Sequence, residues 1–397
     1  MWRRTRDLVA GILIGSLLMG IWVSAKAESG TDLSSVVPFS AQALWLMKQT
    51  RSLLETYHVD GDKPADEKKM LYGAVRGILQ AWGDPYTRFL DPAQLKEEEI
   101  EVQGEYGGLG IYIAQKDGRT LVISPIEGTP ADRAGLKPND EIVKIGEEVI
   151  LGWDQDRVVK TLRGPAGSGV TIWIRREKEE RLLKFELKRE NISLKTVKLE
   201  KMNTSVAYIR LSFFNEKTSE EMKKALAQAN AMKASGIVLD LRNNPGGLLN
   251  AATEIVDMFV DEGIIVGMKG RFERANEVIH ATKGTQTRLP MVVLVNEGSA
   301  SASEIVSGAL KDLKRAKVIG KKTFGKGSVQ TLFHLSDGSA MFITIARYYT
   351  PSGLVIDHVG LKPDIVVEGE PVKDHKKDAQ LQKALQELKK IPGKQTN

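Results

Sequence analysis

Residues 291–304 read MVVLVNEGSASASE, an apolar strand that runs through a turn of small residues into the start of a helix. Residues 236–247 read GIVLDLRNNPGG and repeat that arrangement, with an almost uninterrupted apolar stretch before a glycine-rich turn. Strands that lack polar alternation are buried on both faces, as in the parallel sheets of α/β proteins. The two stretches therefore predict an α/β layer with a mainly parallel core.

The alternation of strands and helices extends from about residue 196 onward. We expect strands at 206–211, 236–241, 291–295, 318–319, 329–332 and 341–346, and helices at 219–232, 248–259 and 303–313. Residues 104–188 instead predict a small β-rich domain, with strands at 109–113, 120–123, 141–145, 170–175 and 182–187 and a helix at 153–162. We also expect helices in the upstream segments, at 39–58, 66–82 and 93–101. These segments offer few apolar residues for a core, which favours a docking or dimer-forming role.

The composition excludes several classes of protein. With 397 residues, of which 42% are hydrophobic, the chain is long enough for two or three globular domains. The absence of cysteine excludes disulfide frameworks, thiolate zinc sites and cysteine nucleophiles, and no histidine has the spacing of a metal ligand. The net charge is +6, but the basic excess is concentrated in 1–27 and 372–397. Because the rest carries no basic stripe, we expect no binding of nucleic acid.

The N-terminus resembles a targeting segment. Basic residues at 1–6 precede the uncharged apolar run 8–23, and Ala25-Lys26-Ala27 then places small residues as at a signal-peptidase site. The alternative is an uncleaved anchor, since with slight extension the run just spans a bilayer core of about 30 Å. Either interpretation predicts an exported, periplasmic or extracytoplasmic protein.

A candidate nucleophile lies in the turn at 296–303. A serine there is exposed at the carboxyl end of a strand, and the helix N-terminus offers N–H groups to a developing oxyanion. The alternative is structural, because Ser301 and Glu304 also fit a capping box. Serines at 299, 301 and 303 leave the choice of nucleophile open at this point.

Two further stretches carry candidate chemistry. Lys326 lies between two glycines, and a lysine that burial makes neutral accepts a proton from a serine without any histidine. The alternative is a surface turn with a solvated lysine. The Pro-Gly-Gly turn at 245–247 can direct N–H groups at a ligand, or else is an ordinary strand-to-helix loop.

In this order, the three stretches resemble the carboxyl-terminal processing proteases, which are tail-specific serine peptidases with a Ser–Lys dyad. The resemblance covers about residues 40 to 370 and includes DPYTRFL at 84–90, RYYTPSG at 347–353 and GLKPD at 360–364. It implies that Ser301 is the nucleophile, that Lys326 is the general base and that Gln330 supports the lysine.

The same resemblance implies an oxyanion hole formed by the N–H of Ala302 with that of Gly246 or Gly247, and no metal or organic cofactor. Asn243 departs from the family pattern, which often has glycine before Asn-Pro-Gly-Gly. This departure leaves the geometry of that loop open.

Residues 106–111, YGGLGI, resemble the carboxylate-binding loop of a PDZ domain, and 124–142 resemble the stretch before its later strands. N–H groups of such a loop hold a terminal carboxylate while the peptide adds as a strand. The resemblance implies that peptide is bound by Gly108, Leu109, Gly110, Ile111 and Arg163. Arg163 would also contact a partner near Gln330, whereas its structural alternative is to cap the end of a helix.

The sequence therefore predicts a mixed α/β (α+β) chain. Its parts are a signal peptide or membrane anchor (1–27), an N-terminal helical segment (28–95), a PDZ-like domain (96–188), a Ser–Lys protease core (189–371) and a basic C-terminal tail (372–397). The expected function is that of an envelope serine endopeptidase that recognises free C-termini of proteins or peptides. We also expect a homo-oligomer, with membrane association through the N-terminus. Two alternatives stay open: a non-catalytic PDZ-type scaffold, and a Ser–His hydrolase that uses His334.

Overall fold

The chain folds into two compact units, seen in a computed structural model that describes residues 41–63, 66–116, 118–202, 205–372 and 374–391. The larger unit holds residues 97–266, 279–326 and 350–397, and the smaller unit holds the N-terminal part to Lys96 with 267–278 and 327–349. The predicted targeting segment at 1–27 lies outside the described residues. Within the described residues, we find no helix that is both long enough and apolar enough to cross a membrane.

A six-stranded sheet forms the core of the larger unit and confirms the predicted parallel layer. Its order is β10 (Val197–Lys201), β11 (Val206–Leu211), β12 (Gly236–Asp240), β15 (Met291–Val295), β16 (Lys317–Gly320) and β19 (Ile365–Val366). Every pair after β10–β11 is parallel. The polar turns that follow β12 and β15 therefore emerge at the same edge of the sheet.

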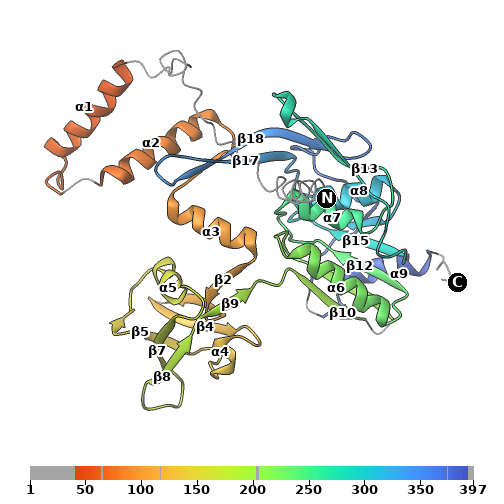
Figure 1. The fold of residues 1–397 in the computed structure, drawn as a ribbon, viewed down its shortest axis with the longest axis horizontal. Helices are drawn as coiled ribbons and strands as arrows, with labels where there is room; N and C mark the ends of the chain where they lie inside the picture. Colours follow the sequence, from red (N-terminus) through yellow and green to blue (C-terminus); the bar gives the residue numbers. More distant parts are fainter. Residues whose placement is uncertain (1–40, 64–65, 117, 203–204, 373, 392–397) are drawn as a thin grey trace, which may run out of the picture. The chain divides into compact units, whose positions relative to one another are not determined.

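Helices cover both faces of this sheet. Because the parallel strands follow chain order, right-handed crossovers place α6 (Thr218–Ala231), α7 (Leu249–Asp257) and α8 (Ala302–Asp312) on one face (Figure 1). The other face packs against α9 (Ala379–Lys389), whose Leu381, Ala384, Leu385 and Leu388 join the buried cluster. The apolar face expected in the C-terminal segment is thus part of the core.

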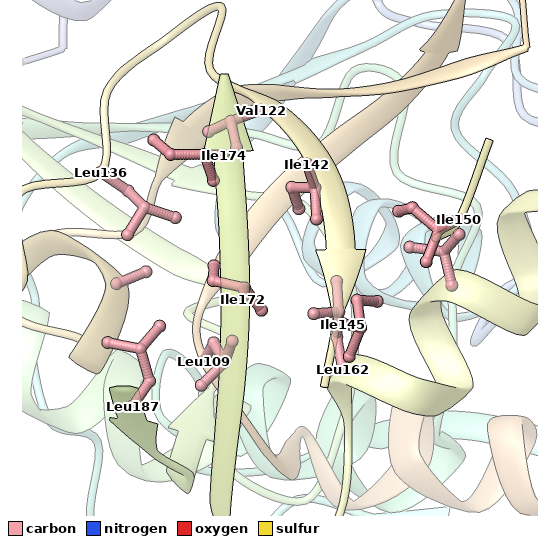
Figure 2. Packing of buried hydrophobic residues seen from close by; sticks show 12 residues of the cluster. Leu109, Val122, Leu136, Ile142, Ile145, Ile150, Leu162, Ile172, Ile174 and Leu187 are labelled. Atoms are coloured by element: carbon pink, nitrogen blue, oxygen red, sulfur yellow. The ribbon is translucent and has the colours of Figure 1, made fainter. Parts of the chain in front are cut away.

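The β-rich domain is a second sheet in the larger unit. It consists of β3 (Ile111–Lys116), β4 (Arg119–Pro125), β5 (Glu141–Ile145), β7 (Gly169–Arg175) and β8 (Leu183–Lys188), with β6 (Glu148–Val149) beside β5. A separate pair joins β2 (Glu105–Gly108) to β9 (Glu190–Ser193), and the helices are α4 (Pro130–Arg133) and α5 (Gln155–Leu162). Figure 2 shows its core, in which Ile172 and Ile174 project from the same face of β7.

The strand predicted at 109–113 is wrong in its boundaries. The chain leaves β2 at Gly108 and enters β3 only at Ile111. Gly110 has φ +74°, and a Cβ at that position would lie 2.4 Å from the side chain of Thr129. A left-handed glycine therefore interrupts the strand and forms the loop in front of it.

The smaller unit contains an antiparallel sheet that the sequence pattern did not separate from the parallel layer. Its order is β1 (Arg88–Leu90), β18 (Ala340–Tyr349), β13 (Ile264–Gly270) and β14 (Glu277–His280), with β17 (Ser328–His334) beside β18. The smaller unit includes β13 from Gly267 onward and β14 as far as Val278. The strands expected at 329–332 and 341–346 form a hairpin in this sheet, because a short turn joins them and so short a connection allows only antiparallel pairing.

Helices complete the smaller unit. They are α1 (Ala41–Tyr57), α2 (Glu67–Trp82) and the first part of α3 (Pro92–Gln103), which continues into the larger unit, with the short 3₁₀ helix η2 (Glu273–Ala275) between β13 and β14. Leu90, Leu95 and Ala340 form a small buried cluster. In contrast, α1 buries none of its side chains. The three helices predicted upstream are confirmed, including the low core content of the first.

Candidate active site

Ser301 stands at the junction of β15 and α8, in a backbone conformation that is rare for a residue with a side chain. Its φ is +52° and its ψ is −115°. The Glu304 side chain accepts the N–H of Ser301, as it would in the capping box of the structural alternative, while the N–H of Glu304 donates to the backbone carbonyl of Ser301. However, an N-cap residue ordinarily has extended backbone angles, so capping does not explain the left-handed φ. Strain of this kind persists where the surroundings enforce it, and it is concentrated at functional sites.

The neighbouring serines are engaged in structural hydrogen bonds. The Ser299 hydroxyl donates to the carbonyl of Leu241 at 2.8 Å and accepts the N–H of Asn296 at 3.0 Å. The Ser303 hydroxyl donates to the carbonyl of Asn244 at 2.9 Å. Both serines are fully buried, whereas Ser301 is partly exposed. Of the three serines, Ser301 therefore has the environment that a nucleophile requires.

Glu304 connects the Ser301 turn to the loop that carries Lys326. One carboxylate oxygen accepts the N–H of Ser301 and the N–H of Lys326, each at 2.9 Å. The two main-chain nitrogens therefore lie within about 6 Å of each other. The other oxygen accepts the Thr323 hydroxyl and the N–H of Gly325. The structure thus brings together the backbones of the two residues predicted to form the dyad.

These four donors match a carboxylate rather than a carboxylic acid. Glu304 is fully buried, and burial raises the pKa of its carboxyl above the ordinary value, while the four hydrogen bonds oppose that shift. The Thr323 hydroxyl accepts the N–H of Leu361 at 2.6 Å, so its own hydrogen is directed to Glu304. Each carboxylate oxygen has two donors, which leaves no acceptor beside it for a carboxyl proton. Pattern reasoning identified Glu304 only as a helix cap and missed this connecting role.

The Pro-Gly-Gly turn lies directly behind the serine. Gly246 has φ +107°, and a Cβ there would lie 2.8 Å from Cβ of Ser301 and 3.0 Å from the nitrogen of Ala302. Its N–H donates to the side-chain oxygen of Asn244 at 2.9 Å. Glycine is therefore required at 246 for close approach, but its N–H is already bound within the turn. Gly247, with φ +135°, is the other glycine predicted for the oxyanion hole.

Asn243 is accommodated in this turn by a reciprocal amide pair. It adopts the left-handed φ of +56°, which asparagine tolerates better than most residues. Its N–H donates to Oδ1 of Asn296 at 2.8 Å, and its Oδ1 accepts from Nδ2 of Asn296 at 2.7 Å. Asn243 therefore adopts the backbone conformation that the glycine of the family pattern would also adopt.

The start of the same turn contains a buried ion pair that pattern reasoning missed. Asp240 and Arg242 are both buried, and the guanidinium Nη2 donates to Oδ2 of Asp240 at 2.6 Å. Burial disfavours the ionised form of Asp240, but hydrogen bonds and charge from Arg242 outweigh it and hold the pKa of this carboxyl below its ordinary value. A charged pair in an otherwise apolar strand end is a signal that the sequence does contain, at DLR in 240–242.

Gln330 and His334 both lie on β17, in the smaller unit, whereas Ser301 and Lys326 belong to the larger unit. The amide of Gln330 donates to the hydroxyls of Ser328 at 2.8 Å and Thr344 at 3.3 Å. The predicted support of Lys326 by Gln330 stays a prediction. Among the described residues, no group of three or more histidine or acidic side chains is placed to hold a metal ion.

A cavity of about 80 Å³ lies beside the predicted carboxylate-binding loop. It is lined by Tyr106, Leu109, Gly110, Ile111, Ile113, Val159, Leu162 and Arg163, which include four of the five residues predicted to bind peptide. The fifth, Gly108, ends β2 beside this loop. The lining is mainly apolar, with a guanidinium at its edge.

Arg163 is the C-cap residue of α5, and its backbone N–H donates to the carbonyl of Val159 at 2.9 Å, but its side chain is engaged away from the last carbonyls of the helix, unlike in its structural alternative. Its guanidinium lies 4.5 Å from the ring centroid of Tyr106 and forms an ion pair with Glu97. The last carbonyls of α5, those of Thr161 and Leu162, instead accept hydrogen bonds from Arg189 at 2.8 and 2.9 Å. The side chain of Arg189 thus satisfies these two carbonyls, and Arg163 is one of the residues that line the cavity.

Comparison with known proteins gives two family matches. Residues 205–367 match the model of peptidase family S41, and residues 107–187 match that of the PDZ domain. A carboxy-terminal-processing protease of Bartonella bacilliformis is 41% identical over 310 residues, which cover 76% of this chain and 70% of that protein. The carboxy-terminal processing protease CtpA of Bacillus subtilis is 35% identical over 303 residues, which cover 76% of this chain and 65% of the relative.

A solved structure assigned to the S41 proteases, from Bacteroides fragilis, shares the fold. It is 17% identical, covers 88% of this chain and 97% of its own chain, and superposes with a TM-score of 0.51. The fold, the two family matches and the identity to these relatives agree with one another. The chain belongs to peptidase family S41, as a serine-type peptidase of the carboxyl-terminal processing group that carries a PDZ domain.

Proposed function

We propose that this peptidase cleaves proteins by a Ser–Lys dyad of Ser301 and Lys326. The observation that carries the proposal is the shared carboxylate of Glu304, which hydrogen-bonds the main-chain N–H of both residues. The left-handed backbone of Ser301 and the structural use of Ser299 and Ser303 support the choice of nucleophile. Membership of family S41 supports the reaction class.

In the proposed mechanism, the Ser301 hydroxyl attacks the scissile carbonyl as neutral Lys326 takes its proton. The tetrahedral oxyanion is stabilised by N–H groups at the start of α8 and in the Pro-Gly-Gly turn. Because the N–H of Gly246 is bound to Asn244, we assign this role to Ala302 and Gly247. Lys326 then gives its proton to the leaving amine, which leaves an acyl-enzyme on Ser301. In the second half of the reaction, Lys326 takes a proton from water, the water attacks the ester carbonyl, and the proton returns to the Ser301 oxygen as the product acid leaves. Gln330 is assigned to orient the lysine.

The dyad predicts that Ser301→Ala and Lys326→Arg both abolish hydrolysis of an unstructured protein such as casein. Alanine removes the nucleophile, and arginine cannot give up its proton near neutral pH. Ser352→Ala is the control, because this exposed serine lies outside the turns that hold Ser301 and Lys326, and Ser303→Ala tests the neighbouring serine. Hydrolysis is measured with purified residues 28–397.

Two results would contradict the dyad. Turnover by Lys326→Arg would eliminate lysine as the proton acceptor. Turnover by Ser301→Ala together with an inactive Ser303→Ala would show that Ser303, and not Ser301, is the nucleophile. Peptide binding by a wild-type protein that shows no hydrolysis would instead favour the scaffold alternative.

We further propose that the PDZ domain selects substrates by their free C-terminus. The loop Gly108–Ile111 ends one strand and begins the next, and the apolar cavity beside it is large enough for a small side chain. Arg163 also lines that cavity, and although its guanidinium pairs with Glu97, it still has N–H groups to offer a carboxylate. A terminal carboxylate in the loop and an apolar terminal side chain in the cavity fit these groups.

The tail proposal predicts that amidation of the C-terminus of a peptide substrate weakens its binding about tenfold or more, since a charge-assisted hydrogen bond contributes roughly 1.5–3 kcal/mol. Cleavage should slow in proportion. Arg163→Ala should reduce the difference between the free-acid and amidated peptides. Arg157→Ala is the matched control, because this arginine on the same helix lies over Trp153 and pairs with Glu148 instead of lining the cavity. Equal cleavage of the two peptides by wild type would contradict tail recognition.

We propose that the protein works in the cell envelope as a homo-oligomer. Residues 1–27 either anchor it in the membrane or are cleaved as a signal peptide. The oligomer is supported by α1, which buries none of its side chains although it carries several large apolar ones. The exposed fraction is 61% for Trp45, 59% for Leu46 and 51% for Leu53. A second copy of this helix would bury these residues against their own counterparts.

The oligomer proposal predicts that purified 28–397 sediments as a dimer or larger species and that Trp45→Glu with Leu53→Glu converts it to monomer. A charge at the centre of an apolar contact must be desolvated, so association should weaken by several orders of magnitude. Lys48→Gln with Arg51→Gln is the charge-matched control, because it also changes the charge of the helix by two units but removes no apolar side chain. A wild-type protein that stays monomeric at tens of micromolar would contradict the proposal.

A further inference from the structure

The helix α9 begins beyond residue 367, where the match to the S41 family model ends, yet its first residues contact the base of the Pro-Gly-Gly turn. Asp378 is the N-cap of this helix and Gln380 lies in its first turn. Both side chains are buried, with exposed fractions of 1% each. Burial of a carboxylate is unfavourable unless it is paired, so its partner indicates why it is there.

That partner is Arg242. Its Nη1 donates to Oδ1 of Asp378 at 3.0 Å and its Nη2 donates to Oδ2 at 2.8 Å, which is a bidentate pair. Nη1 also donates to Oε1 of Gln380 at 3.0 Å. On its other side, the guanidinium donates through Nε and Nη2 to Asp240. Every N–H of Arg242 thus has an acceptor, and α9 supplies the acceptors on one side.

The guanidinium is fixed in position by this arrangement. Two bidentate carboxylates leave a planar guanidinium no freedom to rotate. The amide of Gln380 is itself fixed, because its Nε2 donates to the carbonyls of Val367 at 2.9 Å and Gly369 at 3.1 Å. Because Arg242 is 1% exposed, water cannot replace a lost partner without rearrangement.

The backbone of Arg242 leads directly into the turn behind the serine. Asn244, two residues on, accepts the N–H of Ala300 at 3.0 Å and the Ser303 hydroxyl at 2.9 Å through its carbonyl. Its side-chain oxygen holds the N–H of Gly246. A displacement of Arg242 would therefore be transmitted to both sides of the predicted oxyanion site.

We propose that Asp378 and Gln380 are positioning residues for hydrolysis: they hold Arg242, and through it the turn that carries Gly247, against the start of α8. This inference rests on the Ser301 mechanism proposed above. It assigns to the C-terminal helix a part in transition-state stabilisation, in addition to its part in the core. Neither residue contacts the substrate in this account.

A purely structural role makes a different prediction. If α9 only stabilises the fold, a variant at 378 should lower the melting temperature and leave the kcat of the folded protein unchanged. If α9 positions the turn, kcat should fall while KM stays near the wild-type value, because the PDZ domain that is proposed to bind the peptide is untouched. A transition-state analogue should lose affinity by the same factor as kcat.

The test is Asp378→Asn in purified residues 28–397, with Asp374→Asn as its matched control. Asparagine keeps the size of the side chain and remains a good N-cap, but it removes the charge that pairs with Arg242. Asp374 is an exposed aspartate in the same segment. We expect Asp378→Asn to lower kcat for a free-acid peptide about 10- to 100-fold, with KM changed less than about twofold. Inhibition by a peptidyl aldehyde, which forms a tetrahedral adduct with the serine, should weaken to a similar extent.

A kcat for folded Asp378→Asn equal to that of wild type would overturn the proposal, as would a loss that merely follows the folded fraction. If Asp378→Asn does not fold, Gln380→Met decides the question in the same way, with a smaller expected loss of kcat because one of five N–H groups loses its acceptor. Hydrolysis that survives Ser301→Ala would show that the proposed function has failed, which the Asp378 measurement by itself cannot show.

Discussion

The fully buried carboxylate of Glu304 is the interaction on which the geometry of the site depends. It accepts four hydrogen bonds, from Ser301, Thr323, Gly325 and Lys326. A buried carboxylate is costly unless its lone pairs are satisfied, and here each oxygen has two donors. The same charge lies at the N-terminus of α8, where the helix dipole favours it. One side chain therefore fixes the strand-to-helix turn and the lysine loop relative to each other.

The other side of the serine is constrained by a different network. Gly246 approaches Ser301 so closely that no side chain fits, and the turn around it is held by Asn244, by the amide pair of Asn243 and by Arg242. Left-handed backbone at Asn243 and Ser301 is unfavourable in isolation, so the surrounding hydrogen bonds must maintain it. The strained backbone of Ser301 is therefore maintained by the hydrogen-bonded residues that surround it.

Much of this could be predicted from the sequence, because the decisive signals are local. The apolar strands β12 and β15 and the small-residue turn after β15 are visible in the sequence, and the order of the three candidate stretches indicated the family. The role of Glu304 was not predictable, because a capping box looks the same whether or not its carboxylate also bonds a distant loop. The antiparallel sheet of β17 and β18 was missed because an apolar strand pattern does not specify a partner. The pairing of Asp378 with Arg242 spans most of the protease core in sequence, and no periodicity reports such a contact.

The measurement that tests the account most directly is the kcat of Glu304→Gln. Glutamine has the same shape, but its amide nitrogen must face two donors at the position of one carboxylate oxygen, so the Ser301 turn or the Lys326 loop loses its anchor. The account predicts a loss of about 100-fold or more in kcat for folded protein, while Glu297→Gln, at an exposed glutamate paired with Lys321, keeps wild-type kcat. A folded Glu304→Gln enzyme with wild-type kcat would contradict the claim that this carboxylate fixes the positions of the nucleophile and the base relative to each other.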